Sequence, residues 1–155
     1  MADLCPECGA PMPEGGSCRD NFHALLLLES MIPGGPGAVA HCYAVACYGL
    51  QHPDGMNYTA DALAGLRAGV ADLLDGRVTL DGLRHRTRRA VNGAVGVTRR
   101  AGDAAVPWRR GRWPMTVADV LTVAAQRDAY SVQVLRWARS TREALEDRSG
   151  AGGGS

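Results

Sequence analysis

Three cysteines near the beginning of the chain constrain its fold more than any other feature. Cys5 and Cys8 belong to a Cys-Pro-Glu-Cys-Gly motif, and Cys18 follows ten residues after Cys8. Two thiolates at this spacing can bind one metal ion, and the glycine lets the chain turn tightly. Residues 1–17 also contain three prolines, which prevent a long helix. The sequence therefore predicts a metal knuckle over residues 1–17.

A closed tetrahedral site needs a fourth ligand. The residues able to provide one are His23, His41, Cys42, Cys47 and His52. If residues 18–30 and 38–51 form an antiparallel helical hairpin, His52 lies at the same end of it as Cys18. His41 precedes His52 by eleven residues, about 16 Å along a helix, so the two cannot share an ion. Three thiolates and one imidazole suit zinc best. We expect zinc bound by Cys5, Cys8, Cys18 and His52; an iron–sulfur cluster and unligated buried cysteines are the alternatives.

Apolar residues recur at helical spacing through most of the remaining chain, as Leu63, Leu66 and Val70 do. Together with Gly/Pro breakers, this spacing predicts helices over residues 18–30, 38–51, 59–75 and 80–91, one capped by Thr116, and one over 128–147. On the helix 80–91 we expect four residues to face the core: Leu83, Thr87, Ala90 and Val91. No segment alternates polar and apolar residues convincingly, so we do not expect a sheet.

Two segments differ in composition from the helices. Residues 92–115 predict a long ordered loop that Trp108 and Trp113 hold against the helices. Residues 149–155 are rich in Gly and Ser and predict a flexible tail. The chain is therefore expected to be all-α, a bundle of about four to six helices with an N-terminal zinc knuckle. The knuckle (1–17) and the bundle (18–148) would form one zinc-containing domain, residues 1–148.

The positive charge of the chain is concentrated in one segment. All 17 basic residues are arginines, and residues 84–112 hold nine of them against one acid, so this segment carries a net charge of +8. Such a segment can bind an anionic partner or form salt bridges with acidic helices. Arginines interleaved with tryptophans can also bind nucleic acid. The candidate anion-binding residues are Arg109, Arg110 and Arg112, although we favour the salt bridges over nucleic acid.

Two further pairs of side chains are candidates for a functional role. Glu29 and His41 should meet at the end of the hairpin remote from the metal. A carboxylate that orients an imidazole is the core of general-base catalysis, but it is also an ordinary way to satisfy a partly buried histidine, and we favour this structural role. Tyr48 and Gln51 flank His52 and are candidates for orienting its ring.

The order of these motifs resembles a known family. The residues that carry the resemblance are Cys-x-x-Cys-Gly, Cys18-x-x-x-Phe22, His41-x(6)-Tyr48-x-x-Gln51-His52-Pro53, Thr116-Val-Ala-Asp-Val120 and Trp137. They resemble a bacterial family of unknown function that is common in actinobacteria. That family often has an acidic residue where Cys47 stands and an aromatic residue near Arg19. The resemblance implies a zinc-bearing helical domain and carries no known activity.

These observations restrict the classes of function. The start Met-Ala-Asp-Leu-Cys lacks the basic and apolar parts of an export signal, and we see no membrane-spanning segment. An odd number of cysteines, five, fits a reducing cytoplasm. We expect a small cytoplasmic protein with structural zinc that serves a protein partner as a binding or accessory module. The alternatives are a zinc-dependent hydrolase or transferase, and a nucleic-acid-binding protein that uses residues 84–112.

Overall fold

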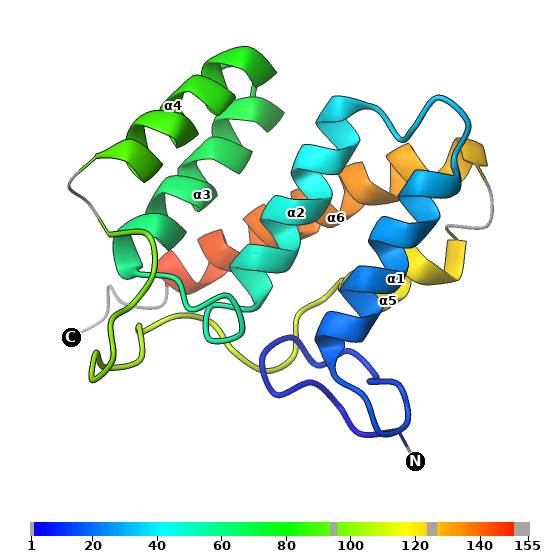
Figure 1. Ribbon diagram of the computed structural model, residues 1–155, viewed down its shortest axis with the longest axis horizontal. Coiled ribbons are helices and arrows are strands. Elements are labelled where there is room, and N and C mark those ends of the chain that lie inside the picture. Colours follow the sequence, from blue (N-terminus) through cyan, green and yellow to red (C-terminus); the bar gives the residue numbers. More distant parts are fainter. Residues whose placement is uncertain (1, 94–95, 124–126, 151–155) are drawn as a thin grey trace.

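The computed structural model describes residues 2–93, 96–123 and 127–150. Within these ranges the chain forms six helices: α1 (Cys18–Met31), α2 (Ala38–Gln51), α3 (Ala60–Leu74), α4 (Leu80–Asn92), α5 (Val117–Val123) and α6 (Arg127–Gly150) (Figure 1). The same residues contain two isolated β-bridges, Leu4 with Pro11 and Tyr58 with Thr98, and no strand. The expected all-α fold is confirmed.

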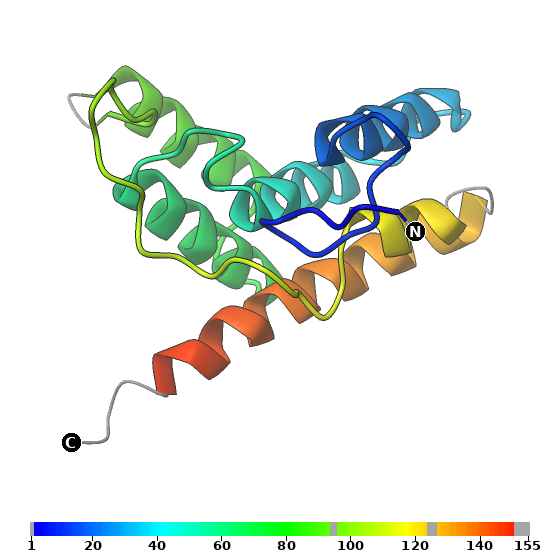
Figure 2. The ribbon, with the colours of Figure 1, turned by 90° about the horizontal axis from the view of Figure 1, so that it is seen from below.

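The helices pack around α6, the longest of them. α2 lies along α6, α3 contacts both, and α5 lies between α1 and α6 (Figures 1 and 2). The core between these helices contains fully buried side chains from three of them, including Leu50, Leu63, Val134 and Trp137. α4 lies outside this core and packs on α3. None of the helices in the described part of the chain is both long and apolar enough to cross a membrane.

Local signals fix where the helices begin and end. The Thr59 hydroxyl accepts a hydrogen bond from the Ala62 N–H at 3.1 Å and so caps α3. At α5, the Asp119 carboxylate accepts from the Thr116 N–H at 2.8 Å. α1 and α2 are separated by an Ile-Pro-Gly-Gly-Pro-Gly connector, residues 32–37. Its three glycines all have positive φ, a conformation that other residues rarely adopt.

The α1–α2 hairpin is antiparallel, as expected. The Phe22 ring stacks on the Tyr48 ring with centroids 4.1 Å apart. The Glu29 and His41 side chains meet at the other end. The loop before α5 is also held as predicted: the indole of Trp108 donates to the Leu50 carbonyl at 2.8 Å, and Trp113 is buried.

The predicted inward face of α4 is wrong. Thr87, Ala90 and Val91 are exposed, and none of the residues of α4 is buried. The half-buried Leu83 packs closely against Gly69 of α3, where a methyl group would come within 2.7 Å of the Leu83 side chain. Because α3 is the main element packed on α4 in the described part of the chain, the side of α4 that carries Thr87, Ala90 and Val91 faces solvent.

At the other end of the chain, α6 extends to Gly150, so residues 149–150 of the predicted tail are helical. Residues 151–155 lie outside the described part of the chain.

Candidate metal centre

Four potential ligands converge where the knuckle meets the α1–α2 hairpin. Cys5 and Cys8 lie on the knuckle, Cys18 is the first residue of α1, and His52 directly follows α2. Their ligand atoms all lie within 4.8 Å of one another, and all four residues are buried. The Sγ of Cys5 is 3.7 Å from Nε2 of His52, and the Sγ atoms of Cys8 and Cys18 are 3.6 Å apart. Tetrahedral zinc with bonds of about 2.0–2.3 Å separates its ligands by about 3.3–3.8 Å, so these two separations match zinc, and the remaining ligand atoms lie within about 1 Å of such spacing.

The knuckle is shaped by its own backbone hydrogen bonds. The Cys5 N–H donates to the Ala10 carbonyl at 2.8 Å, and the Gly9 N–H donates to the Cys5 carbonyl at 2.8 Å. Gly9 has a φ of +84°, which favours glycine at this turn. The Ala10 N–H points at Sγ of Cys8, 3.4 Å away. The Cys-x-x-Cys-Gly motif therefore closes a tight loop that turns both thiols to the same side.

His52 is oriented for binding through one particular nitrogen. Its Nδ1 donates to the Tyr48 carbonyl at 2.7 Å. Since a carbonyl can only accept, the proton of a neutral ring is on Nδ1, and Nε2 presents its lone pair toward the sulfur atoms. The Tyr48 ring also stacks on the imidazole at 3.9 Å between centroids. Tyr48 therefore holds the ring both through its backbone and through its side chain.

The side chain of Gln51 has partners other than the imidazole of His52. Its buried side-chain amide donates to the Met115 carbonyl at 2.8 Å and to the Thr141 hydroxyl at 3.3 Å. These contacts place the Gln51 side chain between α2, α6 and the start of α5, away from the imidazole of His52.

The three thiols of the cluster shift one another's pKa values. A hydrogen bond from the Cys8 thiol lowers the pKa of Cys18, against the effect of burial. The same hydrogen bond, together with burial, raises the pKa of Cys8, and burial raises the pKa of Cys5. Without a cation, burial and mutual repulsion therefore disfavour the presence of more than one thiolate among these three cysteines. A divalent ion would displace the thiol protons, as metal binding to thiolates requires.

The loop before α5 is fastened to the back of the knuckle. The indole of Trp113 donates to the Glu7 carbonyl at 3.1 Å, and its backbone N–H donates to the Cys8 carbonyl at 3.0 Å. The N–H of Gly111 contacts the carbonyls of Pro6 and Glu7. The knuckle therefore joins the hairpin, which follows it directly in sequence, to this loop, which lies far along the chain.

Asp54, which sequence reasoning missed, anchors the same loop to the end of α2. Its carboxylate accepts two hydrogen bonds from Arg110, at 2.7 and 2.8 Å, and one from Arg99 at 3.0 Å. The hydrogen bond and charge of Arg110, aided by Arg99, lower the pKa of Asp54 to about 2. The Glu7 carboxylate accepts from the Asp54 N–H at 2.7 Å. No local pattern marks Asp54, because its partners lie more than forty residues away.

The three arginines singled out as anion-binding candidates differ in their surroundings. Arg110 pairs with Asp54. Arg109 donates to the carbonyls of Ala144 and Arg112 and lies 5.1 Å from the centroid of the Trp113 ring. Arg112 is exposed. On the preceding helix, Arg86 pairs with Asp72 at 2.8 Å. Several of the clustered arginines therefore hold the fold together, which is the role we favoured.

Glu29 and His41 do form a pair, and a third residue joins them. Nδ1 of His41 lies 2.6 Å from Oε2 of Glu29. The other carboxylate oxygen, Oε1, accepts a hydrogen bond from the hydroxyl of Tyr130 on α6. Glu29 and Tyr130 are buried, whereas 53% of the His41 side chain is exposed. Tyr130 was missed, although it continues the apolar stripe of α6 that includes Val134. We call these three residues the Glu29 cluster.

Comparison with known proteins adds a family and nothing more specific. Residues 3–146 match the model of a family of unknown function, DUF5946. The match includes the knuckle and all four converging ligands. No curated protein and no solved structure matches the chain.

Proposed function

The chain belongs to the DUF5946 family of unknown function, and we propose that it is a small helical binding module held together by a structural zinc ion. The observation that carries this proposal is the convergence of three buried thiols and one oriented imidazole within 4.8 Å. The proposed ligands are Cys5, Cys8, Cys18 and His52. Sulfur-rich sites of this composition favour zinc over the harder cations.

The donor set supports a structural role for the ion. Four protein ligands complete a tetrahedron, whereas catalytic zinc sites keep a position for water or substrate. The ring of Tyr48 stacks directly on His52 and so covers part of the site. The zinc-dependent hydrolase or transferase that we considered would require one of the four residues to leave the ion. We therefore rank the enzyme below the binding module.

Zinc would cross-link separate segments of this fold. It would tie Cys5 and Cys8 of the knuckle to the start of α1 and the end of α2. Through Trp113, the same knuckle holds the loop before α5. Thiolate ligands require a reducing compartment, so we propose the cytoplasm as its location.

We further propose that the module acts on a protein rather than on nucleic acid. The candidate arginines for nucleic acid include Arg109 and Arg110, which are engaged with carbonyls and with Asp54. Binding phosphates there would require these internal contacts to break. A protein partner that binds elsewhere on the surface would leave these contacts of Arg109 and Arg110 intact.

Zinc content and single substitutions test this function. Protein purified without added zinc should contain one zinc ion per chain. Replacing Cys5, Cys8 or Cys18 by Ser should reduce the zinc content, because a hydroxyl is a poor ligand for zinc. Cys42→Ser is the matched control, since Cys42 lies outside the cluster and should leave zinc content unchanged. A wild-type protein that is metal-free and fully folded would overturn the proposal.

A further inference from the structure

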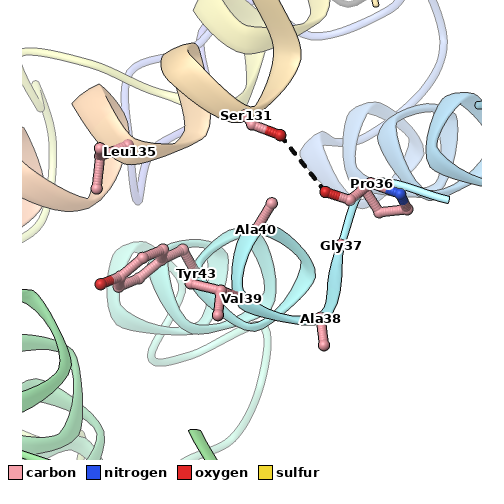
Figure 3. A pocket seen from close by; sticks show the side chains of 8 residues that line it. All are labelled: Pro36, Gly37, Ala38, Val39, Ala40, Tyr43, Ser131 and Leu135. Carbon is pink, nitrogen blue, oxygen red and sulfur yellow. Dashed lines mark hydrogen bonds between the residues drawn. The ribbon is translucent and has the colours of Figure 1, made fainter. Parts of the chain in front are cut away.

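An apolar groove lies between the N-terminal part of α2 and α6, at the end of the hairpin remote from the metal centre. Its volume is about 350 Å³. The residues that form its walls include Val39, Ala40 and Tyr43 from α2 and Leu135 from α6 (Figure 3). Beyond Leu135, the Ser131 hydroxyl donates to the Pro36 carbonyl at 3.4 Å and joins the two walls. The groove is therefore held by a hydrogen bond across its end.

Apolar side chains at this groove remain open to solvent. Val39 is 45% exposed, and Leu135 on the opposite wall is half-buried. Single exposed valines are common on proteins, but apolar residues gathered around a concave surface are typical of a docking site. Val91 on α4 is 62% exposed and does not line this groove, so it can serve as a control for substitutions at Val39.

Positive charge lies at one end of the groove. Ser131, Leu135 and Arg139 follow one another at intervals of four residues along α6, so they share one face of the helix. Arg139 therefore lies about one helical turn beyond Leu135 on this face. Burial raises the pKa of Tyr43, and the charges of Arg139 and Arg142 oppose this rise, which places both charges near the Tyr43 end.

These two arginines differ in how far their charge is neutralised. Arg142 pairs with Asp75 at 2.6 Å. Arg139 is exposed, and it forms no ion pair with any residue in the described part of the chain. The groove therefore combines an apolar floor with one cation that a partner could neutralise.

We infer that this groove binds an acidic amphipathic helix of a partner protein, with apolar side chains against Val39, Tyr43 and Leu135 and a carboxylate near Arg139. The inference rests on the proposed function as a binding module and names the chemistry of its partner. A groove between two helices accepts a third helix through apolar residues spaced three or four apart. A second copy of this chain fits less well, because a symmetric contact would bring two copies of Arg139 to the same interface.

A pair of designed peptides provides the probe. One is a helical peptide of about 18 residues, long enough to form a helix in water, with Leu at every third or fourth position and Glu beside the Leu face. Its match has Lys in place of each Glu. Titrated into zinc-loaded, ¹⁵N-labelled protein, the Glu peptide should shift the NMR signals of Val39, Tyr43, Leu135 and Arg139. The Glu peptide should bind about tenfold more tightly than the Lys peptide, a difference of about 1.4 kcal/mol in binding free energy.

Substitutions on the groove then separate apolar from charged contributions. Val39→Glu and Arg139→Glu should each weaken binding of the Glu peptide about tenfold, as removal of a central contact commonly does. Arg139→Glu should also improve binding of the Lys peptide, because it reverses the charge that the peptide meets. The matched controls are Val91→Glu and Arg89→Glu on α4, which should leave the binding of both peptides unchanged.

The inference is overturned if the Glu peptide causes no shifts at millimolar concentration, or if its shifts map to α4. Equal binding of the two peptides would also overturn it, as would a concentration-dependent dimer that Val39→Glu abolishes. Every variant is first checked for one zinc ion per chain and for wild-type helix content. Failure of peptide binding in such protein contradicts the groove assignment alone, whereas loss of zinc or of folding in the wild type contradicts the proposed function.

Discussion

Removing the Tyr130 hydroxyl and the Glu29 carboxylate, singly and together, tests whether the Glu29 cluster is structural. Tyr130 is fully buried and donates to Glu29, which is itself only 5% exposed. Burial and the hydrogen bond to Glu29 both raise the pKa of Tyr130, so its hydroxyl stays protonated and remains a donor. The pair therefore joins α1 to α6 across the core at the end opposite the metal centre.

The size of the effect follows from which group is left without a partner. Tyr130→Phe deprives a buried carboxylate of one donor, and Glu29→Leu leaves a buried hydroxyl unpaired. Each should cost about 1–3 kcal/mol. The double variant removes both partners, so it should cost no more than the larger single change, with a coupling energy of about 2 kcal/mol. His41→Ala should cost less than about 1 kcal/mol, because the histidine is half exposed.

Thermal unfolding of the zinc-loaded variants, followed by circular dichroism, measures these effects. At about 2–4 °C per kcal/mol for a chain of this size, each single change should lower Tm by roughly 2–12 °C. The double variant should melt no lower than the less stable single variant. Costs of the two single changes that simply add in the double variant would refute the reasoning, because they would mean that the hydroxyl and the carboxylate do not depend on each other.

Three further predictions concern the knuckle and the loop before α5. Asp54→Asn should cost about 1 kcal/mol, since the carboxylate is partly exposed. The pKa of Asp54 falls from the ordinary 3.8 to about 2, so its carboxylate is ionised in both the folded and the unfolded protein from pH 8 to 5. The stability lost in Asp54→Asn, measured by thermal melting, should therefore be constant over this range. Chelation should lower Tm by roughly 10 °C or more and speed trypsin cleavage after the already exposed Arg19, because the knuckle no longer holds the start of α1. Arg110→Ala should lower Tm without changing retention on immobilised DNA, which should already be lost at about 0.3 M salt.

The positions of the helices and the arrangement of the hairpin could be predicted because they depend on local information. Apolar periodicity marks each helix, and glycine and proline mark its ends. Two helices joined by a short connector can pair in few ways, so Glu29 was expected beside His41, and Cys18 at the same end as His52. The convergence of the four potential ligands follows from this register together with the tight turn at Cys8.

Contacts between distant segments could not be predicted in the same way. The inward face predicted for α4 assumed a core on that side, but Leu83 packs against Gly69 of α3 outside the core, and Val91 stays in solvent. Tyr130 looks like an ordinary apolar position of α6 until α1 places Glu29 beside it. Asp54 has no distinguishing neighbours in sequence, because its arginine partners arrive from the loop before α5. In each case the determining partner is a separate element whose position depends on the whole fold.

X-ray absorption at the zinc edge tests the central claim most directly, since it reports the number and type of ligand atoms around the ion. For protein purified without added zinc, we predict three sulfur ligands at about 2.3 Å and one nitrogen ligand at about 2.0–2.1 Å. His52→Ala should remove the imidazole contribution to the spectrum, leaving a more weakly held oxygen ligand such as water or losing the ion, and His41→Ala should leave the spectrum unchanged. A sphere with fewer than three sulfurs, or with a water in the wild type, would contradict a closed structural site at Cys5, Cys8, Cys18 and His52.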